Sequence, residues 1–250
     1  MFRLLALAVS AAFCIFASCD DETPIIATTG EVVLDARATF DDAPVTFTTE
    51  VYDYSDDLGY DLRLTKFDFY ASDVTLVGAD GEEVELDELD LFEFGNANLT
   101  RRYTDIPSGE YTALKMSIGV PQDQNGDFCN TCATTDPLAD ASHWWQNWSS
   151  YIFAKIEGQL DSDGDGVTDD AGIVYHSGTD ELFRTVTVPI SLTVAEATPA
   201  TIALDVDIKA LFRIDGGMID IGQVPATHTD NELANTKLVM DNFERAIGVR

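Results

Sequence analysis

Basic residues are scarce in this sequence, because 14 Lys and Arg stand against 45 Asp and Glu, which gives a formal net charge of -31. Such a charge repels the phosphates of nucleic acids and the headgroups of anionic lipids, so we expect neither as a direct partner. The acidic residues alternate with apolar ones, which make up 45% of the chain, rather than gathering in a tail. This mixture is typical of a folded and highly soluble domain, and not of a disordered segment.

The common short motifs of enzymes are also missing. The 250 residues contain no G-x-S-x-G, no H-E-x-x-H and no phosphate-binding G-x-x-x-x-G-K-[ST]. Only three histidines are present, and the single neighbouring pair His176-Ser177 does not make a catalytic triad. We therefore expect a protein that is not an enzyme.

A long apolar run occurs only at the N-terminus, where residues 4–17 follow Arg3. The run is too short to span a bilayer comfortably, and it ends in "FASC", which resembles the lipobox of bacterial lipoproteins. The resemblance implies a lipoprotein signal peptide over residues 1–18, a lipid on Cys19 and a tether over residues 19–30. We thus expect a protein anchored by lipid alone in the outer membrane or at the cell surface; an ordinary signal peptide is the alternative.

Cysteine is scarce in the rest of the chain, where only Cys129 and Cys132 remain, in "CNTC". In an oxidising compartment, a C-x-x-C pair first predicts a local disulfide. Half of a zinc site is the alternative, although no second C-x-x-C and no histidine pair follows at ligand spacing. A thioredoxin-like role would require a βαβ context, which the sequence does not show.

Strand patterns dominate the remaining sequence. Period-two runs rich in Val, Phe, Tyr and Thr predict strands over residues 45–52, 61–86, 111–120, 151–160, 184–194 and 201–214, and Asp80-Gly81 is typical of a hairpin turn. Many short strands without a βαβ rhythm predict an all-β fold, either a sandwich or a barrel, and we expect an antiparallel β-sandwich. Without internal repeats or linkers, one domain over residues 31–250 is the simplest organisation.

Two segments carry helical signals. Asp136-Pro137 is typical of an N-cap and a first helical position, which predicts a short helix near residues 137–148. On that helix His143 would point away from a shared core face formed by Leu138, Ala141, Trp145 and Trp148. A C-terminal amphipathic helix that ends at Gly248 is predicted by the spacing of Leu233, Thr236, Met240, Phe243 and Ile247.

The segment "DSDGDGVTDD" is typical of a calcium loop, because hard cations require several oxygens at short spacing. Its first Asp, at position 1, is followed by Asp at positions 3, 5 and 9 and by the Gly that a sharp turn needs at position 6. Position 12 is Gly172 instead of the Glu of an EF-hand, so the loop resembles those of thrombospondin type 3 repeats and dockerins. The predicted ligands are Asp161, Asp163, Asp165, the carbonyl of Val167, Asp169 and, in place of the Glu, Asp170. Since strands flank the loop, the expected role of calcium is structural; a solvated acidic turn is the alternative.

All three tryptophans lie in the six residues "HWWQNW", His143 to Trp148. Such a cluster is either a dense part of the core or the surroundings of a site where an aromatic ring has a chemical role. The wider sequence favours the second reading. The blocks "KFDFYASDVTLVGADGEEVEL", "SIGVP", "DPLADASHWWQNWSSYIFAKIEGQ" and "YHSGTD" resemble, in this order, the MbnP-like family.

The resemblance implies a secreted, mostly β protein, often encoded beside a di-haem peroxidase of the MauG type. In the copper-binding members, that partner oxidises a tryptophan to kynurenine at a mononuclear copper site with histidines. Carried over to this chain, the modified residue is Trp145 and the ligand is His176, with His143 as a further candidate. This chain departs from the family pattern at Asn147, at Ser150 and after Pro121, and two of the expected ligands are missing there.

Together, the lipobox, the aspartate loop and the family resemblance predict a metal-binding envelope lipoprotein with structural calcium; the resemblance adds copper and a MauG-like di-haem peroxidase as the partner. The alternative is a calcium-stabilised adhesin or glycan-binding surface module, in which an exposed Trp144 stacks on a sugar.

Overall fold

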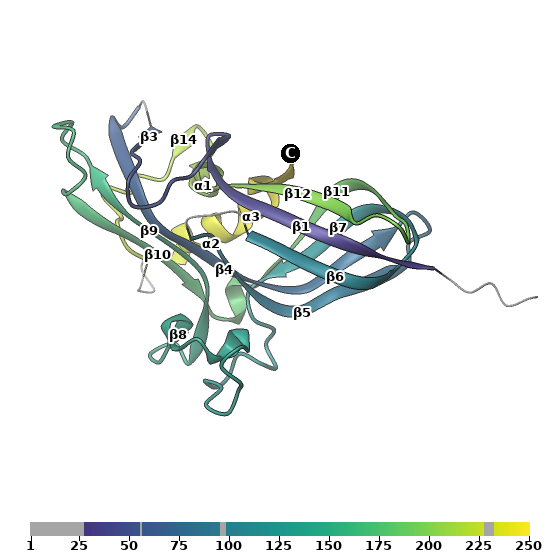
Figure 1. Ribbon diagram of the computed structural model, residues 1–250. Helices are drawn as coiled ribbons and strands as arrows, with labels where there is room; N and C mark the ends of the chain where they lie inside the picture. Colours follow the sequence, from purple (N-terminus) through teal and green to yellow (C-terminus); the bar gives the residue numbers. More distant parts are fainter. Residues whose placement is uncertain (1–27, 56, 96–98, 228–232) are drawn as a thin grey trace, which may run out of the picture.

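The computed structural model describes residues 28–55, 57–95, 99–227 and 233–250, which form a sandwich of two main sheets (Figure 1). The all-β fold predicted from the sequence is confirmed. The predicted signal peptide, Cys19 and most of the tether lie outside the described residues. Within the described residues, no helix is both long and apolar enough to cross a membrane.

The first sheet has five strands, and its central strand is β1 (Thr29–Phe40). The others are β2 (Ala43–Pro44), β6 (Leu99–Pro107), β12 (Ala200–Asp207) and β15 (Ile247–Val249). Antiparallel pairing was predicted throughout, but β1 and β12 run parallel, from Val32 opposite Ala200 to Thr39 opposite Asp207. Alternation along each strand is the same for both directions of pairing, so the sequence pattern could not show this.

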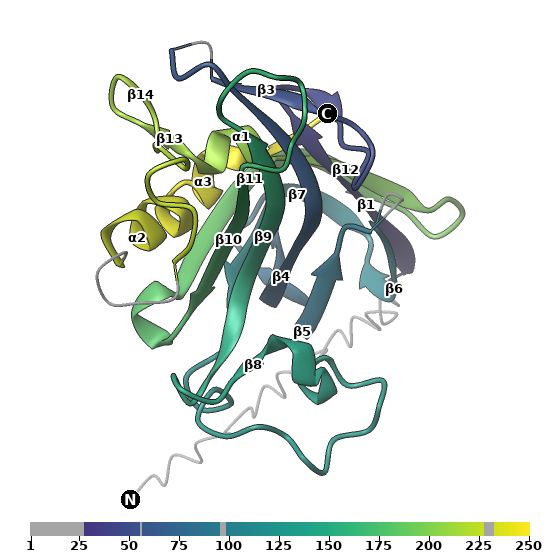
Figure 2. The ribbon, with the colours of Figure 1, turned by 90° about the vertical axis from the view of Figure 1, so that its left-hand side faces the viewer.

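The second sheet has eight strands and is organised by the long strand β4 (Tyr60–Gly78). The others are β3 (Tyr52–Ser55), β5 (Glu83–Glu93), β7 (Gly109–Ile118), β8 (Trp144–Trp145), β9 (Ser150–Asp161), β10 (Ala171–Gly178) and β11 (Arg184–Val194). β9 pairs with β4 as far as Phe69, and β7 pairs with β4 from Ala71 onward. β9 and β7 thus pair with successive parts of β4. The chain between them, residues 119–149, forms the loops around β8 at the lower end of β9 in Figure 2.

The helix expected near residues 137–148 is shorter than predicted. It consists of two 3-10 turns, η1 (Pro137–Ala139) and η2 (Ala141–His143). Asp136 caps the first turn and Asp140 caps the second, each by accepting a hydrogen bond from a backbone N–H two residues later. Asp140 keeps extended backbone angles, and its capping bond competes with a continuous helix. Beyond His143, the backbone forms its hydrogen bonds as strand β8 against the start of β9, instead of continuing as a helix.

The C-terminal helix is interrupted and ends earlier than expected. It divides into α2 (Leu233–Asp241) and α3 (Phe243–Ala246), and Gly248 lies inside β15 rather than marking a helix end. Between the two helices, the buried amide of Asn242 donates to the carbonyls of Leu211 and Arg213, both at 2.8 Å. The predicted apolar stripe is nevertheless buried at Thr236, Met240, Phe243 and Ile247.

The remaining short elements complete this end of the sandwich. They are η3 (Asp180–Leu182), α1 (Ile208–Leu211), β13 (Arg213–Ile214) and β14 (Gly217–Met218). The ring of Phe243 meets Phe69 of β4 edge-on at 5.3 Å, and α3 also contacts β11 and β12. The helices therefore close the space between the two sheets, as Figure 1 shows.

Candidate functional site

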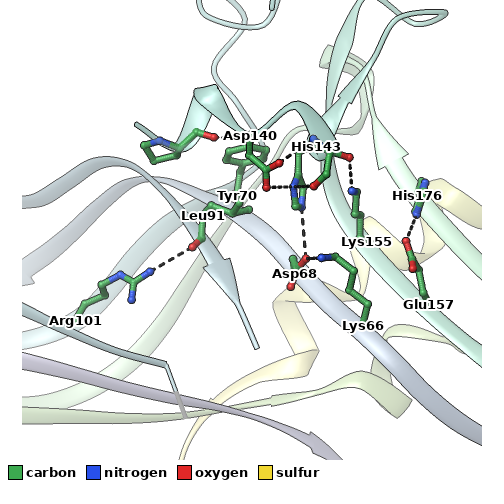
Figure 3. Close-up of polar contacts among 12 residues, drawn as sticks. Lys66, Asp68, Tyr70, Leu91, Arg101, Asp140, His143, Lys155, Glu157 and His176 are labelled. Carbon is green, nitrogen blue, oxygen red and sulfur yellow. Dashed lines mark hydrogen bonds and ion pairs between the residues drawn. The ribbon is translucent and has the colours of Figure 1, made fainter. Parts of the chain in front are cut away.

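Strand β9 connects the tryptophan cluster to the acidic loop. It begins at Ser150, directly after the tryptophan cluster, and it ends at Asp161, the first residue of the acidic loop. Lys155 of β9 stands opposite Asp68 of β4 on one side and opposite His176 of β10 on the other. Because directly opposed residues share a face, these three side chains form a row across the sheet, which Figure 3 shows.

Trp145 and His176 come together at one end of this row. Their rings meet edge-on, with centroids 6.5 Å apart. The imidazole of His176 is largely buried, and its Nε2 lies 2.8 Å from the Oε1 of Glu157. The Thr227 hydroxyl holds the backbone of His176 by accepting from its N–H at 3.1 Å and donating to its carbonyl at 3.2 Å. A histidine oriented by a carboxylate is the usual arrangement of a metal ligand.

Trp148 packs against Trp145 and lines the same pocket as His176. Its ring lies 5.5 Å from that of Trp145, and it also lies against the backbone of Gly178. A Cβ at position 178 would lie 3.0 Å from an indole carbon and 2.6 Å from the Tyr151 carbonyl oxygen, so a larger residue would displace the indole. A cavity of about 130 Å³ adjoins Trp148, His176 and Gly178. The glycine of "YHSG" is thus explained by close packing.

His143, in contrast, is turned away from Trp145. Its fully buried ring has Nδ1 at 3.0 Å from Asp140 and Nε2 at 3.6 Å from Asp68, and in Figure 3 Lys155 lies between it and His176. Burial, together with the charge of Lys155, lowers the pKa of His143 to about 4, so the imidazole is neutral at neutral pH. The sequence-based expectation that His143 points outward is wrong, because its ring packs on Tyr70 below the 3-10 turns.

Buried charges surround His143. Burial raises the pKa of Asp68, against the opposing effect of Lys66, whose ammonium lies 2.8 Å from the carboxylate. Burial also lowers the pKa of Lys155, and its ammonium donates to the Ser142 carbonyl. For Asp140, burial acts to raise the pKa, but hydrogen bonds from Ser142 and His143 outweigh it and lower the pKa. These contacts attach the 3-10 turns to the sheet.

Asn125 has a structural role that sequence reasoning missed. Its buried amide accepts from the Tyr151 N–H at 2.8 Å and donates to the Asp180 carboxylate at 2.8 Å. Ser150, where the family pattern has Gly, donates to the same amide oxygen at 3.1 Å and accepts from the Thr179 N–H at 2.9 Å. The departure at Ser150 therefore adds a link between the loop and the start of β9. Nothing in local spacing marks such long-range bonds.

Cys129 and Cys132 form a disulfide. The N–H of Cys129 donates to the Tyr151 hydroxyl at 2.9 Å, and that hydroxyl donates to the Leu138 carbonyl at 2.8 Å. The disulfide loop is thus tied to a buried residue of β9, and neither sulfur is a thiolate that could replace a missing copper ligand.

Trp144 packs inward on the same cluster. Its ring meets Tyr151 edge-on at 5.1 Å and lies 6.1 Å from Phe128, which leaves it half-buried. Its indole N–H donates to Gln146 at 3.3 Å. A glycan-stacking tryptophan needs an open ring face, and these contacts do not favour that role for Trp144.

The acidic loop at the other end of β9 brings together three of the six predicted calcium ligands. Carboxylate oxygens of Asp161, Asp163 and Asp170 lie within 4.8 Å of one another. Asp161 is buried and accepts from the N–H groups of Gly164 and Gly166 at 2.7 and 2.8 Å. The carboxylates of Asp165 and Asp169 lie outside this group.

Asp170, which was expected to replace the Glu of an EF-hand, lies together with Asp161 and Asp163. It accepts from the backbone N–H groups of Ser162 and Asp163 and from the Ser162 hydroxyl. The bonds from Ser162 and Asp163 lower the pKa of Asp170. The loop therefore holds this carboxylate in its ionised form, facing the other two.

Comparison with known proteins gives one family and one fold. The MbnP family model matches residues 29–234 of this chain. Among solved structures, MbnP from Methylosinus trichosporium is similar, with a TM-score of 0.51 and 16% sequence identity over 74% of this chain and 78% of that chain. At this identity the structural likeness shows a shared fold alone. No curated protein matches the sequence.

Proposed function

The chain belongs to the MbnP family, and from this premise we propose that it is a metal-binding lipoprotein of the cell envelope with a copper site beside Trp145. The contact between the rings of Trp145 and His176 is the observation that supports this best. The two residues carried over from the family, Trp145 and His176, meet there, although one is in the tryptophan cluster and the other is in β10.

The donor groups fit copper in part. Copper(I) accepts two or three imidazole or sulfur ligands. His176 supplies an imidazole that is oriented by Glu157, on a backbone held by the Thr227 hydroxyl, next to a small cavity. The sulfur atoms of Cys129 and Cys132 are joined to each other, and His143 faces Asp68. We therefore assign the copper to His176 and Trp145 and leave His143 out of this site.

Oxidation of Trp145 is the second part of the proposal, with a MauG-like di-haem peroxidase as the partner. Two equivalents of hydrogen peroxide, the oxidant of such a peroxidase, would be reduced to two waters as two oxygen atoms are inserted and the indole C2–C3 bond breaks to give N-formylkynurenine. Hydrolysis would then release the former C2 as formate and leave kynurenine. The half-buried Trp145 lies in β8, at the projecting end of the molecule in Figure 2, where a partner can approach it. This chain itself would be the substrate of that reaction and not an enzyme.

Calcium is the third part. The cluster of Asp161, Asp163 and Asp170 would hold one ion at the tip of the β9–β10 hairpin. Neutralising these carboxylates would relieve their mutual repulsion and stabilise the hairpin that positions His176. A lipid anchor at Cys19, in the outer membrane or at the cell surface, would bring such a loop to a compartment where calcium is available.

Metal analysis of the mature domain tests the proposal. Wild type and His176→Ala would be equilibrated with copper(I) and calcium, dialysed, and analysed by mass spectrometry. We expect one copper in wild type and none in the variant, with calcium retained in both as the internal control. Wild-type protein that retains calcium without copper would refute the copper site and remove the reason to search for kynurenine at Trp145.

A further inference from the structure

His143 has a buried lone pair that the site beside Trp145 does not use. Its Nδ1 is held by Asp140, which in turn accepts from the Ser142 N–H at 2.8 Å. Since the ionised Asp140 can only accept, Nδ1 carries the ring proton and donates it in this hydrogen bond, and Nε2 carries the lone pair. Among the described residues Nε2 has no hydrogen-bond partner, although the ring is fully buried.

This lone pair faces another acceptor. The Oδ2 of Asp68 lies 3.6 Å from Nε2, and the side chain of Asp68 is only 4% exposed. The Lys66 ammonium lies 2.8 Å from the same oxygen but without hydrogen-bond alignment. Two buried acceptors that face each other are costly unless a positive group lies between them. The pair is therefore arranged to receive a cation.

The spacing suits a metal ion. A separation of 3.6 Å between nitrogen and oxygen corresponds to an angle of about 120° at an ion 2.0–2.1 Å from both atoms. The bond from Nδ1 to a carboxylate is also the contact that fixes the tautomer and the orientation of metal-binding histidines. An imidazole with a carboxylate suits a borderline divalent ion better than calcium or magnesium.

We propose that His143 and Asp68 form a cation site for a borderline divalent metal such as Zn²⁺, which binds through Nε2 and Oδ2 in exchange for the Lys66 ammonium. Water would complete the coordination, because two protein ligands leave positions open. This site is separate from the copper site at His176 and does not depend on it.

Lys66 is the replaceable member of the group. Its side chain is 34% exposed, whereas those of Asp68 and His143 are 4% and 0% exposed, so the ion would enter where Lys66 reaches solvent. Glu93 and Glu157 also attract its ammonium, and they offer it new partners once it leaves Asp68. Lys155 stays in place through its bond to the Ser142 carbonyl. Zn²⁺ and Lys66 would thus compete for one carboxylate.

The test needs a background in which the other metal sites are removed. The mature domain with Asp163→Asn, Asp170→Asn and His176→Ala would be titrated with Zn²⁺ by calorimetry and with Co²⁺ by absorption spectroscopy. We expect one equivalent of Zn²⁺ to bind. Adding Asp68→Asn should weaken binding by about tenfold or more, whereas adding Lys66→Met should strengthen it by about tenfold, because a competing positive charge is gone.

Nitrogen NMR of the His143 ring supplies a readout that a purely structural role would not change. Zn²⁺ should shift the Nε2 resonance while Nδ1 stays protonated. Circular dichroism would establish that each variant is folded; if Asp68→Asn is not, Lys66→Met at its partly exposed position remains the deciding variant. The proposal is overturned if the folded background binds no Zn²⁺, if Lys66→Met leaves the affinity unchanged, or if the Nε2 resonance does not move.

Discussion

The indole of Trp148 rests on the backbone of Gly178, so closely that a Cβ at position 178 would lie 3.0 Å from the ring. We expect Gly178→Ala to destabilise the protein by about 1–3 kcal/mol, as overpacking does in other proteins, because the Tyr151 carbonyl on the other side cannot move aside. Denaturant unfolding measures this. Gly172→Ala in the same strand is the matched control, since its Cβ would meet only a side chain at 3.7 Å. Equal losses in the two variants would contradict the packing argument.

Calcium should stabilise the wild-type domain through the acidic loop. At a free concentration one hundred times Kd, an ion bound only by the folded state adds about 2.7 kcal/mol to the free energy of unfolding. We expect Asp163→Asn to abolish most of this gain and EGTA to remove it from wild type. Asp169→Asn is the control, because its carboxylate lies outside the cluster of Asp161, Asp163 and Asp170. The same calcium response in both variants would show that this cluster is not the binding site.

Asn125 should matter far more than its place in a loop suggests. Asn125→Ala leaves the buried Tyr151 N–H without an acceptor, and an unsatisfied buried group of this kind costs about 1–3 kcal/mol. Thermal unfolding should reveal a clearly lower Tm. Asn130→Ala, an exposed position in the same loop, should change stability by less than about 0.5 kcal/mol. If the two variants unfold alike, Asn125 does not anchor the loop.

The disulfide should stabilise the loop without contributing to metal binding. Replacing both cysteines by serine (Cys129→Ser with Cys132→Ser) opens a very short loop, and the chain-entropy relation gives a loss of about 2 kcal/mol. The copper content of the double variant should equal that of wild type, as measured by mass spectrometry. A loss of copper from a folded double variant would instead support a thiolate ligand.

Local patterns in the sequence determined much of this protein. The alternation of apolar and polar residues was sufficient to predict an all-β fold, because each strand must bury one face. The spaced aspartates identified the loop in which Asp161, Asp163 and Asp170 meet, since their separation along a tight turn already brings them close. The cap at Asp136 was predicted too, but the length of the following helix was not, because β8 pairing competes with it.

Tertiary structure alone decided which histidine meets which partner. His143 is two residues from Trp145 in the sequence, yet its ring faces Asp68, whereas the distant His176 lies against the indole. The register of β4, β9 and β10 places Asp68, Lys155 and His176 in one row, and burial over whole strands fixes that register. No local spacing carries this information, because the free energy that selects the register is summed over contacts between segments far apart in the chain.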